Sequence, residues 1–112
     1  MTINEHADAA LHVLTLEGEV DLHHANELRA ALTKIAEAKC PALVVDLSGV
    51  TYMDSAGLAT LVEYMQRATK FGGQLALGGV SARLRTIFDL ARLDEIFAIH
   101  ESLDAAKAAL RA

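Results

Sequence analysis

The sequence contains very few cysteine, proline and aromatic residues. Its 112 residues include one cysteine (Cys40), one proline (Pro41), two tyrosines, three phenylalanines and no tryptophan. A lone cysteine forms neither an internal disulfide nor a metal cluster, so we interpret Cys40 as a small apolar residue near a helix end. Apolar runs stay short of the roughly 20 residues that a membrane helix needs, and Met1 to His6 lack the layout of a signal peptide. We therefore expect a cytoplasmic protein without membrane insertion.

The common motifs of enzymes and nucleotide-binding proteins are also missing. The turn from Met53 to Gly57 lacks the glycine two positions before the serine that a hydrolase nucleophile elbow requires. Neither G-x-x-x-x-G-K-[ST] nor G-x-G-x-x-G after a strand occurs, and no carboxylate pair stands out. The neighbours His23 and His24 point in different directions in regular structure, which makes them a poor metal site. The sequence predicts no enzyme, no cofactor and no metal.

Positive charge is scarce in the first half of the chain. The net charge is −5, but residues 1–64 hold three basic and ten acidic residues, a net of −7, whereas residues 65–112 have a net of +2. Nucleic-acid binding needs clustered Lys and Arg, so we do not expect a nucleic-acid partner. An acidic half is instead suited to a partner with a basic face.

The apolar pattern alternates between short runs and helical spacing. It predicts strands around Ile3 and over 11–17, 42–47, 74–77 and 96–99. It predicts helices over 24–39, from Ser55 to Phe71, after Ser81 and after Ser102, the two serines acting as N-caps. Gly18 is expected to end the second strand, Pro41 the first helix, and Gly72-Gly73 the second. The predicted inner faces of the last three helices are Leu58, Leu61, Val62 and Met65; Leu84, Ile87, Phe88 and Ala91; and Ala105, Ala106, Ala109 and Leu110.

This order of elements predicts an α/β fold. We expect a single domain over residues 1–112, with a central mixed sheet of four to five strands and about four helices packed over it. The run at 42–47 does not alternate, which is typical of a strand covered on both faces. Loops at strand ends, 18–24, 49–55 and 78–81, are expected to gather along one rim, where ligands and partners of such sheets bind.

A serine lies where the buried strand gives way to the second helix. In Asp54-Ser55-Ala56-Gly57-Leu58, one interpretation is that Asp54 or Ser55 only caps the helix, which typically contributes ~1 kcal/mol. The other is that Ser55 accepts a phosphate, which a helix N-terminus tolerates and which would repel a docked partner. From the residues alone both interpretations stay open.

Several segments, in the right order and spacing, resemble a STAS domain and, more narrowly, a bacterial anti-sigma factor antagonist. They are Gly18-Glu19-Val20-Asp21, the run from Val45 to Leu58, Phe71-Gly72-Gly73, and the run from Phe88 to Leu93. One departure is Ala56, where many relatives carry Ser or Thr, so a single acceptor hydroxyl remains. The same motif also occurs in stressosome scaffolds, in anion-transporter tails and in the small subunit of bacterial lipid-transport ATPase complexes.

The resemblance implies a non-enzymatic switch protein. Its unphosphorylated form would bind an anti-sigma factor that is also a GHKL-type serine kinase, phosphorylation of Ser55 would release it, and a PP2C-type phosphatase would reset it. The alternatives are a non-catalytic STAS subunit of a lipid-transport complex and a nucleotide-binding role. The sequence specifies neither the sigma factor nor the oligomeric state. The residues expected to contact the partner are Asp21, His23, His24, Asp54, Ser55, Ala56, Gly57, Leu58 and Ser81.

Overall fold

A computed structural model describes residues 1–8 and 10–111. The strands are β1 (Thr2–Asp8), β2 (Leu11–Val20), β3 (Ala42–Met53), β4 (Gln74–Gly78) and β5 (Ala98–Ile99). The helices are α1 (Ala25–Glu37), α2 (Ser55–Phe71), α3 (Ala82–Leu90) and α4 (Leu103–Arg111), with a short 3₁₀ helix, η1 (Leu93–Glu95). Over the described residues the predicted α/β fold, with a mixed five-stranded sheet and four α-helices, is confirmed.

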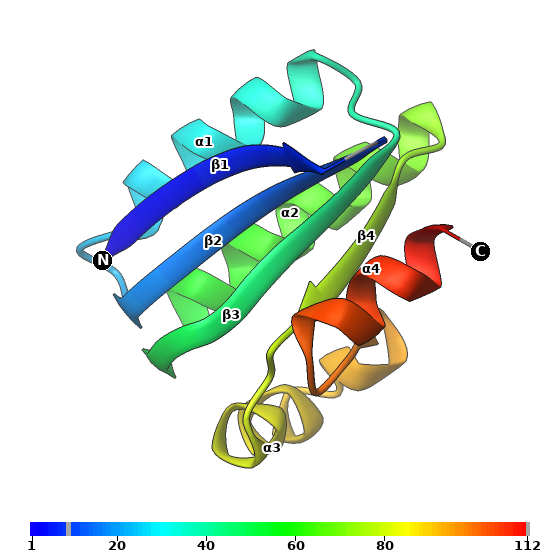
Figure 1. Ribbon diagram of the computed structural model, residues 1–112. Coiled ribbons are helices and arrows are strands. Elements are labelled where there is room, and N and C mark those ends of the chain that lie inside the picture. The colour runs from blue at the N-terminus through cyan, green and yellow to red at the C-terminus, as the bar shows by residue number, and fades with distance from the viewer. Residues whose placement is uncertain (9, 112) are drawn as a thin grey trace.

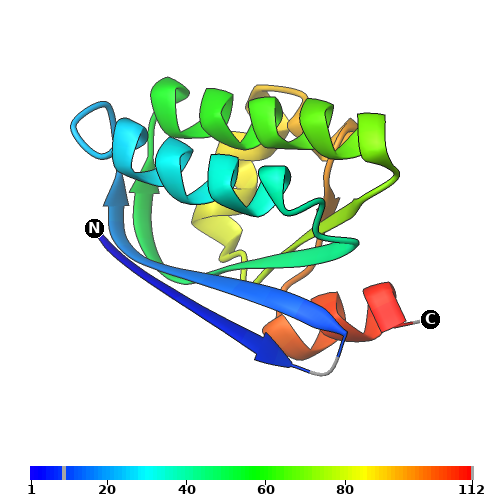
Figure 2. The same cartoon turned by 90° about the horizontal axis from the view of Figure 1, so that it is seen from above.

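The strands lie in the sheet in chain order, β1-β2-β3-β4-β5. β1 is antiparallel to β2, and each later strand is parallel to its neighbour. Helices α1 and α2 lie side by side on one face of the sheet, and α4 lies on the opposite face (Figures 1 and 2). Because β2, β3 and β4 are parallel, their carboxyl ends point in the same direction.

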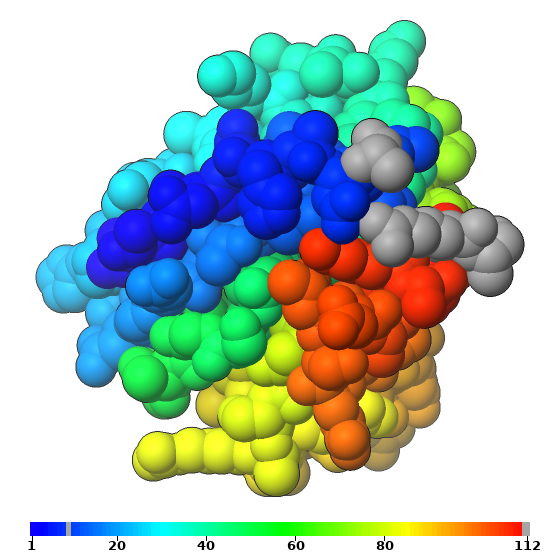
Figure 3. Space-filling view, in the orientation of Figure 1, coloured from blue at the N-terminus to red at the C-terminus, as the bar shows by residue number. Residues whose placement is uncertain are grey.

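The core has two layers that share β3. The layer under α1, α2 and α3 includes Leu28, Leu61 and Phe88, and the smaller layer under α4 includes Val44 and Ala106. Residues 42–47 are all buried, so the prediction that this strand is covered on both faces is confirmed. Figure 3 shows that α4 covers only part of its face and leaves surface of β1, β2 and β3 open beside it.

Two strands run further than predicted. Gly18 does not end β2: with φ +92° it occupies a conformation that glycine adopts easily, beside a register irregularity, and β2 continues to Val20. β3 runs past residue 47 to Met53, because its extension pairs with the extension of β2. Another register irregularity lies between Thr15 and Glu17, which pair with Asp46 and Gly49. There the buried Asp46 carboxylate accepts bonds from the Ser48 N–H (3.0 Å) and hydroxyl (2.7 Å).

The last third of the chain also corrects the sequence prediction. The strand predicted over 96–99 is only Ala98–Ile99, because η1 comes just before it and the Phe97 side chain is buried in the core. The Phe97 ring packs edge-on against Phe88, with 6.0 Å between the ring centroids. Ala91 is exposed at the C-cap of α3 rather than part of its inner face. The predicted stripe of α4 is wrong at Ala105 and Ala109, which are exposed, because Leu103, Ala106 and Leu110 face the sheet.

The predicted helix ends are confirmed where a side chain or a glycine determines them. Ser81 Oγ accepts the Leu84 N–H at 3.1 Å, and Ser102 Oγ accepts the Ala105 N–H at 3.0 Å. Gly72 ends α2 in the left-handed conformation, with φ +76°. These ends position the loops, and the end of β3 leads through Asp54 directly into Ser55, the first residue of α2.

Candidate functional site

Asp54 forms the junction between β3 and α2. Its backbone is extended, and its Oδ1 accepts the Gly57 N–H at 3.0 Å, which makes it the N-cap of α2. The other carboxylate oxygen, Oδ2, accepts the Leu22 N–H at 3.0 Å, and the Asp54 N–H donates to the Val20 carbonyl at 3.2 Å. The cap predicted at this turn is therefore Asp54, and the same side chain ties the turn to the loop after β2.

Ser55 is the first residue of α2 and is exposed. Within the described part of the chain its hydroxyl takes part in no hydrogen bond, because Asp54 already caps the helix. The first N–H groups of a helix point outward without intrahelical partners, so this end carries a partial positive charge. Ser55 therefore presents a free hydroxyl at a position suited to a negatively charged group.

Gly57 allows α2 to begin close to the end of β2. A Cβ at this position would lie 2.5 Å from the Val20 carbonyl oxygen and 2.9 Å from Met53 Cγ. No real Cβ approaches a backbone oxygen so closely, so any larger residue would push the first turn of α2 away from the sheet. The short distance between the loop after β2 and Ser55 depends on this glycine.

The loop from Asp21 to His24 has its own internal bonds. His24 Nδ1 lies 2.7 Å from Asp21 Oδ1, and the His24 N–H donates to the Asp21 carbonyl at 3.0 Å. Desolvation opposes ionisation of the Asp21 carboxyl, but the hydrogen bond and charge of His24, with the charge of His23, outweigh it and lower the pKa of Asp21. Asp21 is thus held as a carboxylate beside the Asp54 turn.

The structure brings together most of the predicted site. Asp21, His23 and His24 lie in the loop after β2, and Asp54 connects this loop to Ser55 and Ala56 at the start of α2. All six residues are at least partly exposed. Gly57 and Leu58 are buried, and Leu58 is 9% exposed within the core, so these two support the surface from beneath. That the partner contacts any of these residues stays a prediction.

Ser81 lies apart from this pair of loops. The register pairs Gly78, at the end of β4, with Asp46, well before the end of β3 at Met53. The loop after β4 therefore starts further back along the sheet than the Asp54 turn. Ser81 is exposed and caps α3, and among the described residues no hydrogen bond connects it to Asp54 or Ser55.

The sequence analysis did not identify two exposed apolar residues of this region. The side chain of Leu22 is 72% exposed in the middle of the loop after β2. Tyr52 is 49% exposed near the end of β3, opposite Glu19 of β2. An apolar residue inside a loop of charged and histidine residues is the one signal that could have pointed to Leu22.

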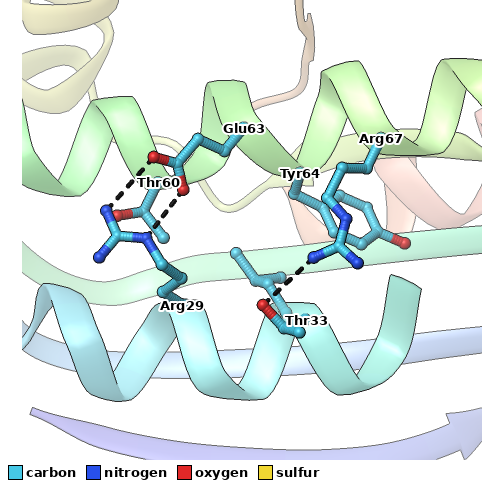
Figure 4. Close-up of a pocket in the computed structure, with 7 residues that line it drawn as sticks. Arg29, Thr33, Thr60, Glu63, Tyr64 and Arg67 are labelled. Carbon is cyan, nitrogen blue, oxygen red and sulfur yellow. Dashed lines mark hydrogen bonds and ion pairs between the residues drawn. The ribbon is translucent and has the colours of Figure 1, made fainter. Parts of the chain in front are cut away.

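Two hollows lie elsewhere. A cavity of about 80 Å³ separates α1 from α2 (Figure 4), where Arg29 Nε donates to Glu63 Oε2 at 2.8 Å and Arg67 donates to the Thr33 hydroxyl at 3.3 Å. These bonds pair the charged side chains of the cavity across the two helices, so we interpret it as a helix contact rather than a ligand site. The hydroxyl of Tyr64, which also lines the cavity, has no partner among the described residues. A larger hollow, of about 490 Å³, lies beside Ser81.

In residues 1–8 and 10–111, no three His, Cys, Asp or Glu side chains are grouped as metal ligands would be. Within the same ranges no helix combines the length and apolar character that crossing a bilayer requires.

Comparison with known proteins identifies the family. The model of the STAS domain matches residues 1–106. An anti-sigma-B factor antagonist of Bacillus subtilis (strain 168) is 37% identical over 86 residues, which are 77% of this chain and 78% of that protein.

Two solved structures extend this similarity to the fold. An anti-sigma factor antagonist from Mycobacterium paratuberculosis has a TM-score of 0.87 at 29% identity, over 99% of this chain and 94% of that one. The Bacillus cell fate determinant SpoIIAA in its phosphorylated form has a TM-score of 0.75 at 18% identity, over 97% of this chain and 99% of that one, a likeness of fold. The chain belongs to the STAS domain family, and the relatives it resembles include anti-sigma factor antagonists.

Proposed function

We propose that this chain is an anti-sigma factor antagonist switched by phosphorylation of Ser55. The observation that carries the proposal is the exposed Ser55 hydroxyl, which has no partner among the described residues and lies at the N-terminus of α2. Asp54 caps the helix, so the serine is not needed for that purpose. The two interpretations of the sequence are therefore compatible, with Asp54 as the cap and Ser55 as the acceptor.

The switch works by local electrostatics. A phosphate on Ser55 adds about −1.5 to −2 charge at the end of a helix whose dipole favours negative charge, so the fold is retained. The same charge appears beside the Asp54 carboxylate and the loop that carries the Asp21 carboxylate. A partner that docks on this surface in the unmodified state then meets added negative charge and a hydrated phosphate, which weaken the complex.

The partners follow from this role. The unmodified protein binds an anti-sigma factor with GHKL-type serine kinase activity, which frees the sigma factor, and a PP2C-type phosphatase restores the serine. The chain itself is a cytoplasmic binding protein rather than an enzyme. The names of the relatives reported above support this role over that of a subunit of a lipid-transport complex.

The test is phosphotransfer followed by intact mass. Each GHKL-type serine kinase of the source genome is purified and incubated with ATP and either the wild-type protein or Ser55→Ala. We expect at least one kinase to add a single phosphate to the wild type and none to Ser55→Ala. An unmodified wild type with every kinase, or equal modification of both proteins, would refute the proposal.

A further inference from the structure

Leu22 is an apolar side chain that the fold leaves in solvent. Four large hydrophobic residues are exposed in the described ranges, Leu22, Tyr52, Leu90 and Ile96, and Leu22 is 72% exposed. It stands between Asp21 and His23, in a loop that is otherwise polar. A single exposed leucine is common on protein surfaces, so its exposure alone marks nothing. What distinguishes Leu22 is how its backbone is held.

Leu22 is fixed to the turn that carries Ser55. Its N–H donates to Asp54 Oδ2 at 3.0 Å, although the two residues are 32 positions apart in the chain. A second bond connects the same two segments, because the Asp54 N–H donates to the Val20 carbonyl at 3.2 Å. The bonds between Asp21 and His24 close the loop around Leu22. A side chain on a backbone fixed in this way loses less conformational freedom on binding than one on a loose loop.

The surroundings of Leu22 are acidic. Glu19 precedes the loop, Asp21 is the residue before Leu22, and the Asp54 carboxylate accepts the Leu22 N–H. All three lie in the half of the chain whose net charge is −7. The matching surface is an apolar pocket bordered by Lys or Arg. A second copy of this chain would bring the same carboxylates against themselves, which disfavours a symmetric dimer through this loop.

We propose that Leu22 is the apolar anchor that docks the Ser55 kinase, in a pocket with a basic border, and that Asp54 holds this anchor at a fixed distance from the serine. This inference rests on the proposed function, since the occupant is the kinase of that switch. It adds a residue that determines partner affinity without touching the transferred phosphate. Leu22 is thus a docking residue and Asp54 a positioning residue.

The test compares Leu22→Ala with Leu90→Ala, a leucine that is 82% exposed at the end of α3. The probe is the purified kinase that phosphorylates Ser55 of the wild type, and steady-state phosphotransfer and the Kd without ATP are measured. Because apolar anchors dominate interface energies, we expect Leu22→Ala to raise KM and Kd about ten-fold or more. We expect kcat to stay unchanged and Leu90→Ala to stay within about two-fold of the wild type. Both variants should melt like the wild type.

Three results would overturn the anchor. They are an unchanged KM and Kd for Leu22→Ala, an equal loss for Leu90→Ala, and a fall in kcat alone. A wild type that dimerises through this loop, with the dimer lost in Leu22→Ala, would assign the surface to a second copy instead. Failure of the proposed function is a different result, because the wild type itself would then accept no phosphate at Ser55.

Discussion

The two bonds of the Asp54 carboxylate can be separated by substitution. Oδ1 accepts the Gly57 N–H and Oδ2 accepts the Leu22 N–H, both at 3.0 Å. Asp54→Asn keeps one acceptor oxygen, which can still cap α2, but places an NH₂ group opposite the Leu22 N–H. Asp54→Ala removes both acceptors. Comparison of the two variants therefore separates the contribution of the α2 cap from that of the bond between Asp54 and the loop after β2.

The expected losses of unfolding free energy follow from these two bonds. Loss of an N-cap costs typically ~1 kcal/mol. A hydrogen bond to a charged group contributes about 1.5–3 kcal/mol, and we take the low end for Leu22 because this contact is exposed. Asp54→Ala should thus lose about 2–3 kcal/mol of unfolding free energy, and Asp54→Asn about 1–2 kcal/mol.

Urea unfolding followed by circular dichroism measures the two free energies, and hydrogen exchange of the Leu22 amide reports the second bond directly. In Asp54→Asn we expect the Leu22 amide to exchange faster while the Gly57 amide stays protected. If Asn and Ala destabilise equally, or if the Leu22 amide keeps its protection in Asp54→Asn, the carboxylate does not hold the two loops together.

Two further predictions concern the core. Gly57→Ala should destabilise the protein by about 1–3 kcal/mol in the same urea assay although alanine favours helices, because its Cβ would lie 2.5 Å from the Val20 carbonyl oxygen; equal or greater stability would contradict this packing. Burial of Tyr64, whose hydroxyl has no partner among the described residues, raises its pKa to about 12, so the folded state binds a proton that the unfolded state loses at lower pH. This difference stabilises the folded state fully below the unfolded pKa. As the pH rises from about 10 to 12, the unfolding free energy falls by about 3 kcal/mol. Tyrosinate absorbance of Tyr52→Phe, in which Tyr64 is the only tyrosine, measures this titration, and ionisation near pH 10 in a folded protein would contradict it.

The parts of the site that depend on local sequence were predictable. Apolar spacing located α2, and the position of Asp54 after a buried strand and before that helix indicated a cap. The parallel order of β2 and β3 followed from alternating strands and helices, and it brought Asp21 and Ser55 to the same end of the sheet. The family resemblance then suggested the role of Ser55.

The features that depend on residues distant in the sequence could not be predicted. Ser48 and Gly49 have the composition of a turn, yet they lie in β3 because β2 extends beside them and Asp46 holds the irregularity. In α4 the alanines give no contrast between an inner and an outer face, so the packing of Ala106 decides it. The position of Leu22 depends on a hydrogen bond to Asp54, 32 residues away, which no local pattern reveals.

The central claim is that a phosphate on Ser55 weakens the partner complex while leaving the fold intact. The most direct measurement is calorimetric titration of the kinase, without ATP, with unmodified protein, with enzymatically phosphorylated protein and with Ser55→Ala. We expect the unmodified protein and Ser55→Ala to bind alike, and the phosphorylated form to bind at least about ten-fold more weakly with an unchanged circular dichroism spectrum. Equal affinity of the phosphorylated and unmodified proteins would contradict the account, as would a phosphorylated form that has lost its fold.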